Sequence, residues 1–219
     1  MDRFILIGAG RCGTTLYIDS IAQKLNCFRE IFCRYSKTND WSIFDFDTSK
    51  YNEPFTISLE ENQKRCWAKY CKVAHKKYTG YKILYDHIAN DVLDYIRTIP
   101  TIQVVRRNRL AHFVSVKATQ LTRSYFYNEF DLTVTVDPDE YRSFSDWVTI
   151  QDQLYKAVSG ITIYYEDDYQ ENMDKICDFL EIDRFVPAKP LNKQVKRPLS
   201  EVIINYEEVR HLDKNMARI

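Results

Sequence analysis

The sequence lacks any long hydrophobic run. A membrane-spanning helix needs about 20 consecutive apolar residues, and no stretch of the 219 residues approaches that length. The apolar run at residues 4–7 is too short for the core of a signal peptide, and Gly8 and Gly10 interrupt it directly afterwards. We therefore expect a cytoplasmic protein that does not have a membrane as a partner.

The sequence also lacks an excess of charge of either sign. Lysine and arginine total 31, and aspartate and glutamate also total 31. Nucleic-acid binding depends on a basic surface, so this balance argues against a nucleic acid as a partner. A local pocket for a small anion is still compatible with it.

No CxxC pair occurs among the six cysteines, and no metal-ligand spacing appears elsewhere in the chain. We therefore expect no bound metal and reduced, mostly buried thiols. The six residues are Cys12, Cys27, Cys33, Cys66, Cys71 and Cys177.

Short apolar runs alternate with amphipathic stretches along the chain, which is typical of an α/β fold. The pattern predicts a three-layer domain whose central, mostly parallel sheet has about five strands. Ligands of such sheets bind beyond the carboxyl ends of the strands. The predicted strands cover residues 4–7, 27–32, 80–85, 101–105 and 161–165.

A glycine-rich loop at residues 8–15 follows the first predicted strand and leads into a helix. Glycines let the backbone approach an anion closely, and the first turn of a helix offers free N–H groups. Two threonine hydroxyls and one guanidinium add further donors. We therefore predict a P-loop-like anion-binding loop, with Gly10, Arg11, Cys12, Gly13, Thr14 and Thr15 as its candidate ligands.

This loop fits more than one class of nucleotide-binding protein. Gly8, Gly10 and Gly13 satisfy the GxGxxG pattern of Rossmann-type dehydrogenases, in which Glu30 would bind the ribose. Residues 8–15 also nearly satisfy the P-loop pattern GxxxxGK[ST]. Thr14 stands at the lysine position, so a kinase would have to be a degenerate one.

A second motif follows the fourth predicted strand, where Arg107 precedes Ser115 by eight positions. An arginine at a strand end and a serine two turns along the next helix can converge on one phosphate. The Arg-x-Gly-Thr-Thr stretch that starts at Arg11 resembles the 5′-phosphosulfate loop of sulfotransferases that use 3′-phosphoadenosine 5′-phosphosulfate (PAPS). Arg107 and Ser115 resemble the pair that binds the 3′-phosphate in this family.

The pattern is most similar to bacterial and carbohydrate-type sulfotransferases. The resemblance covers most of the chain but is sparse over residues 34–78 and 120–160. It implies one sulfotransferase domain over residues 1–219. Residues 183–219 would form a C-terminal tail that packs on or caps the nucleotide site.

The resemblance also implies a reaction, in which a sulfuryl group moves from PAPS to a hydroxyl of a carbohydrate or other small acceptor without a metal. Arg11 would stabilise the leaving phosphate, and Lys82 would contact the sulfuryl group. The cytosolic small-molecule sulfotransferases have a histidine as the base at the position where this chain has Leu84. Glu30, in the Glu-x-Phe context of bacterial members, is therefore the expected general base, with His87 in reserve. A non-catalytic module that binds the product, 3′-phosphoadenosine 5′-phosphate (PAP), is the remaining alternative.

Overall fold

A computed structural model describes residues 3–28, 75–76, 78–87, 90–122, 132–188 and 197–212 of the chain. Five strands in these ranges form one sheet, in the order β2-β3-β1-β4-β5, and every neighbouring pair is parallel. The strands are β1 (Phe4–Gly8), β2 (Cys27–Phe28), β3 (Gly80–Leu84), β4 (Thr101–Val105) and β5 (Ile161–Tyr164).

The two central strands show why the sheet forms. All five residues of β1 are buried and so are all five of β4, as expected for parallel strands that are covered on both faces. The predicted fold class is therefore confirmed, and four of the five predicted strands match to within one residue at each end. The prediction of a strand over 27–32 agrees with β2 at Cys27–Phe28, and its remainder lies outside the described residues.

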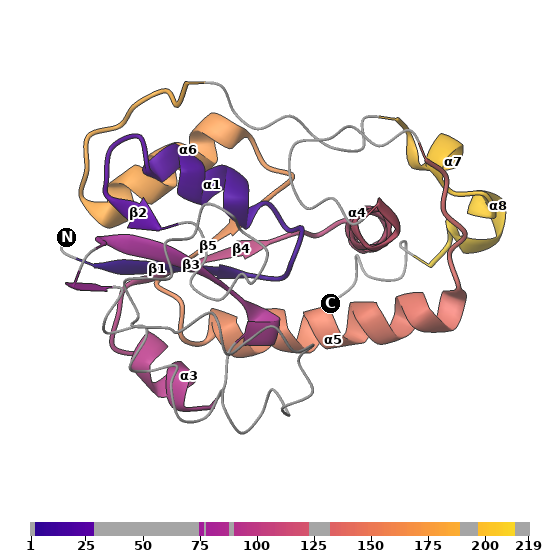
Figure 1. The fold of residues 1–219 in the computed structure, drawn as a ribbon, viewed down its shortest axis with the longest axis horizontal. Helices are drawn as coiled ribbons and strands as arrows, with labels where there is room; N and C mark the ends of the chain where they lie inside the picture. The colour runs from indigo at the N-terminus through magenta and orange to yellow at the C-terminus, as the bar shows by residue number, and fades with distance from the viewer. Residues whose placement is uncertain are drawn as a thin grey trace, which may run out of the picture.

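Helices cover both faces of the sheet (Figure 1). Helices α1 and α6 lie on one face, and α3 and α5 lie on the other, while α4 lies beyond the carboxyl end of β4. A short 3₁₀ helix, η3 (Tyr85–His87), follows β3 directly. The longer helices are α1 (Thr14–Ile21), α3 (Asn90–Ile96), α4 (Arg109–Thr122), α5 (Pro138–Lys156) and α6 (Tyr169–Leu180).

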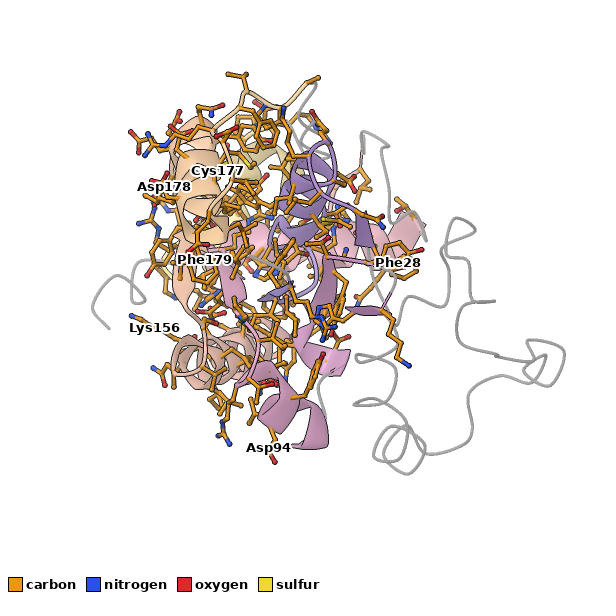
Figure 2. All side chains as sticks on the ribbon, turned by 90° about the vertical axis from the view of Figure 1, so that its left-hand side faces the viewer. Phe28, Asp94, Lys156, Cys177, Asp178 and Phe179 are labelled. Carbon is orange, nitrogen blue, oxygen red and sulfur yellow. The ribbon has the colours of Figure 1, made fainter. Side chains whose placement is uncertain are left out.

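Helix α5 begins with a well-formed cap. The Asp137 carboxylate accepts hydrogen bonds from the backbone N–H groups of Asp139 and Glu140, both at 2.9 Å, and Pro138 occupies the first turn. Helix α6 is capped in the same way by Asp168, which accepts from the N–H of Glu171. Figure 2 shows Asp178 on the outer side of α6, where its carboxylate pairs with an exposed arginine.

The described part of the C-terminal tail, residues 197–212, packs beside α4 and α5. It contains two single-turn helices, α7 (Leu199–Val202) and α8 (Tyr206–Val209), and a parallel bridge joins Ile203 to Val134. Val202, Ile203 and Val209 share a second apolar cluster with residues of α4 and α5. That the tail caps a nucleotide site remains a prediction.

Within the described ranges, no helix combines the length and the apolar character that crossing a bilayer would require.

Candidate functional site

The loop between β1 and α1 has a backbone that only certain residues adopt without strain. Gly13 has a φ of 100° and is the N-cap of α1. A Cβ atom at Gly13 would lie 2.5 Å from Cδ2 of Tyr165. Arg11 has a φ of 68°, in the left-handed region that non-glycine residues seldom occupy. Such strain persists where the surrounding structure imposes it, and it is frequent in ligand-binding loops.

Three carbonyl groups of this loop are held by donors from the protein. The N–H of Cys12 donates to the carbonyl of Ala9 at 3.3 Å, and Nε2 of His112 donates to the carbonyl of Gly10 at 2.6 Å. Arg106 donates from a terminal guanidinium nitrogen to the carbonyl of Arg11 at 3.2 Å. These carbonyl oxygens are thus satisfied within the protein, and no side chain among the described residues caps the first turn of α1.

The Arg11 guanidinium joins the loop to α4. Its Nε lies 3.5 Å from Oγ of Ser115, which is a buried residue. The pKa of Arg11 is lowered by burial and, second, by the positive charge of Arg106. Two half-buried guanidinium groups therefore repel each other beside the loop, and a bound anion would relieve this repulsion.

Lys82 brings a further cation to the first turn of α1. It lies in the middle of β3, only 3% of it is exposed, and its Nζ is 2.6 Å from Oγ1 of Thr15. The structure thus brings together Arg11, Thr15, Lys82 and Ser115, which the sequence separates by up to 104 positions.

The Arg107 side chain contacts residues at the end of β5 and just after it. Its guanidinium forms an ion pair with Asp167 and stacks on the ring of Tyr164, and its side chain is 54% exposed. The Glu166 carboxylate accepts from the N–H groups of Arg107 and Asn108, at 3.0 and 2.9 Å. Ser115 contacts Arg11, and the convergence of Arg107 and Ser115 on one phosphate stays a prediction.

Sequence reasoning missed a buried polar network beside this loop. Arg109 and Asp152 form an ion pair in which the side chains are 8% and 11% exposed. The hydroxyl of Tyr85 donates to Asp152 at 2.8 Å, and Gln103 donates to Tyr85 and to the carbonyl of Asp152. Thr162 completes the network through Gln103. These residues lie on five different elements, so no single stretch of sequence reveals them.

His112 is a second residue that the sequence did not indicate as part of the site. It is fully buried, and burial lowers its pKa to about 3, an effect that nearby arginines increase. It is therefore neutral at pH 7. Because Gly10 offers a carbonyl, the proton lies on Nε2.

The remaining candidate residues lie in the loop or at the edge of the described part of the chain. Cys12 and Thr14 are buried within the loop, and burial raises the pKa of the Cys12 thiol to about 12. Glu30 lies outside the described residues, and His87 is described only through its backbone, as the last residue of η3. Their assignment as general base or reserve base stays a prediction.

Among the described residues, no group of three or more histidine, cysteine, aspartate and glutamate side chains is arranged to hold a metal ion.

No protein-family model matches the chain, and no curated protein sequence is significantly similar to it. Among solved structures, the chain is similar to shikimate kinase from Acinetobacter baumannii in complex with shikimate. The TM-score is 0.49, the sequence identity is 11%, and the match covers 83% of this chain and 93% of the kinase chain.

Proposed function

We propose that this protein is a PAPS-dependent sulfotransferase. The observation that carries the proposal is the contact between Arg11 Nε and Ser115 Oγ, because it joins the loop motif to the motif of α4 in one site. The site lies at the carboxyl ends of parallel strands, where such sheets bind their ligands. Its donors are cations, hydroxyls and backbone N–H groups, which suit a nucleotide with several anionic groups.

In the proposed reaction, the acceptor oxygen attacks the sulfur of PAPS while the bond from sulfur to the 5′-phosphate oxygen breaks. The loop and Arg11 hold the 5′-phosphate and stabilise the charge that develops on it. Lys82, beside Thr15, is placed to bind the sulfuryl oxygens. The proton of the acceptor hydroxyl passes to the general base, for which Glu30 remains our proposal.

The proposal assigns the 3′-phosphate of the nucleotide to Arg107 and Ser115. Arg107 would have to leave Asp167 first. Because this ion pair is about half exposed on the arginine side, its loss costs only about 0–1 kcal/mol.

A degenerate P-loop kinase is the rival function. Lys82 favours it in one respect, because its ammonium supplies a cation near α1 that Thr14 cannot supply. Lys82 also counts against it, because P-loop enzymes give the hydroxyl at the position of Thr15 to Mg²⁺, and here a lysine binds that hydroxyl.

Thermal denaturation in the presence of PAP, ATP with Mg²⁺, or NAD separates these functions. A ligand at 100 times its dissociation constant stabilises the folded protein by about 2.7 kcal/mol. We expect stabilisation by PAP. If ATP or NAD stabilises the protein and PAP does not, the sulfotransferase proposal is rejected. If PAP binds, incubation with PAPS and a panel of sugars and phenols must give a sulfated product, since a binding module would give none.

A further inference from the structure

Arg106 differs from the two arginines that come after it on the same segment. Arg107 pairs with Asp167, and Arg109 pairs with Asp152. Within the part of the chain that the structure describes, the half-buried Arg106 forms no ion pair with a carboxylate. Burial lowers its pKa most, and the nearby Glu166 carboxylate raises that pKa without forming a direct ion pair.

The Arg106 guanidinium lies against the anion-binding loop. One terminal nitrogen donates to the carbonyl of Arg11, and the carbon of the guanidinium lies 4.9 Å from the centroid of the Tyr165 ring. Tyr165 in turn packs against Gly13. The Nε of Arg106 is a buried donor for which the described residues provide no acceptor. Stacking on an aromatic ring leaves the N–H groups in the plane of the guanidinium available to a ligand.

The backbone that follows Arg106 is fixed by hydrogen bonds. Glu166 accepts from the N–H groups of Arg107 and Asn108, and Arg109 donates to the carbonyl of Arg106 at 2.6 Å. Arg106 and Arg107 come directly after β4, and their side chains have different partners. Arg106 therefore projects toward the loop while Arg107 projects toward Asp167, and the held backbone maintains this difference.

We propose that Arg106, supported by the ring of Tyr165, is a second guanidinium ligand of the loop-bound phosphate, the 5′-phosphate that becomes the leaving group. This inference rests on the proposed function. Arg106 and Arg11 would then bind one anion between them, and the anion would relieve the repulsion between the two charges. An arginine fork can bind two oxygens of one phosphate, which a lysine cannot do.

Calorimetric titration of Arg106→Gln with PAP and with adenosine 5′-monophosphate, which lacks the 3′-phosphate, tests the inference. We expect both affinities to fall by the same factor, about 10- to 100-fold, because one charge-assisted contact is lost from a group that both ligands share. Unchanged affinities, or a loss confined to PAP, would overturn it. Arg97→Gln removes the same charge from the exposed end of α3 and should alter neither affinity.

Arg106→Lys guards against a variant that fails to fold. It retains the charge and loses the fork, so we expect an affinity between those of the wild type and Arg106→Gln for both ligands. Wild-type affinity in Arg106→Lys would refute the requirement for a fork.

Inorganic pyrophosphate separates this inference from the proposed function. If the wild-type protein binds no PAP, the sulfotransferase proposal fails. Pyrophosphate binding that is weakened by Arg106→Gln would still support Arg106 as a ligand of the loop anion, and binding that is unchanged by Arg106→Gln would refute it.

Discussion

Arg11 and Ser115 are 104 positions apart in the chain, and in the folded protein Nε of the arginine lies 3.5 Å from Oγ of the serine. The arginine comes from the loop after β1, and the serine comes from the second turn of α4. The contact makes these two segments two sides of one anion site, and each group that builds this site can be tested separately.

Arg11→Gly should separate the charge of Arg11 from its backbone conformation. At a φ of 68° a glycine is less strained than an arginine, so we expect unchanged or slightly increased stability, by up to about 1 kcal/mol. Turnover should fall by about 10²–10³-fold, because the guanidinium interacts most strongly with the charged transition state. Urea denaturation and initial rates measure the two effects. Full turnover in Arg11→Gly would remove Arg11 from the mechanism.

Gly13→Ala should destabilise the fold by about 1–3 kcal/mol, because the new methyl group meets Tyr165 and the φ of 100° disfavours it. Gly10→Ala is the matched control. The nearest atom to its Cβ would be Cδ1 of Leu84 at 4.0 Å, so its stability should stay within about 0.5 kcal/mol of the wild type. Equal effects of the two substitutions in urea denaturation would contradict this account of the loop.

His112 should make the protein less stable in acid. Its pKa is about 3 when folded and about 6.5 when unfolded, so below pH 6.5 the unfolded chain binds a proton that the folded chain does not. The stabilisation that comes from neutral, buried His112 is complete above pH 6.5 and is lost progressively as the pH falls toward 3. Between pH 7 and 5, His112 alone should reduce the free energy of unfolding by about 2 kcal/mol.

His112→Gln measures that contribution, because glutamine does not titrate and retains a side-chain donor. We expect the difference in unfolding free energy between pH 7 and 5 to be smaller in this variant by about 2 kcal/mol. His75 is also buried, with a pKa lowered to about 4, so some acid sensitivity should remain. An identical pH dependence in His112→Gln and the wild type would show that His112 is not the neutral group described here.

The sequence was sufficient to predict the sheet, because 4–7 is an apolar run and 101–105 a mostly apolar segment, both of strand length, which a parallel sheet buries on both faces. It is insufficient at Asp137, because the stretch Asp-Pro-Asp suits a turn as well as the helix cap that the structure has there. Turns and helix N-caps favour the same residue types, so only the helical residues that follow Asp139 distinguish a cap from a turn.

The candidate site was predictable only in part. The position of Arg11 in the loop follows from the spacing of the glycines, and the contact of Lys82 with Thr15 depends on the pairing of β3 beside β1. The spacing of residues in the sequence could not show whether the Arg106 or the Arg107 side chain points toward the loop. That depends on the path that the backbone takes after β4 ends at Val105. The Arg109–Asp152 pair joins α4 to α5 and could not be inferred from either segment.

Glu30→Gln should identify the general base. If Glu30 takes the proton of the substrate hydroxyl, turnover of Glu30→Gln should be lower than that of the wild type by about 10²–10⁴-fold. The affinity for PAP should stay nearly constant, since a carboxylate contributes little to binding an anion. Initial rates and calorimetry give the two values. His87→Ala is the companion variant, and a severe loss of rate there with a mild one in Glu30→Gln would reassign the base. A fall in nucleotide affinity in Glu30→Gln would instead indicate a ribose ligand.

The position of β1 at the centre of the sheet affects how the chain matures on the ribosome. β1 ends at Gly8, its partners begin at Gly80 and Thr101, and the second partner is synthesised roughly 5–20 s after β1 at 5–20 residues per second. Both edges of β1 are unpaired until β3 has been made, and one edge stays unpaired until β4 has been made, which favours association with other chains. The sheet around β1 therefore cannot be completed before β4 has been synthesised. Until then, we expect chaperones to bind the exposed β1 segment.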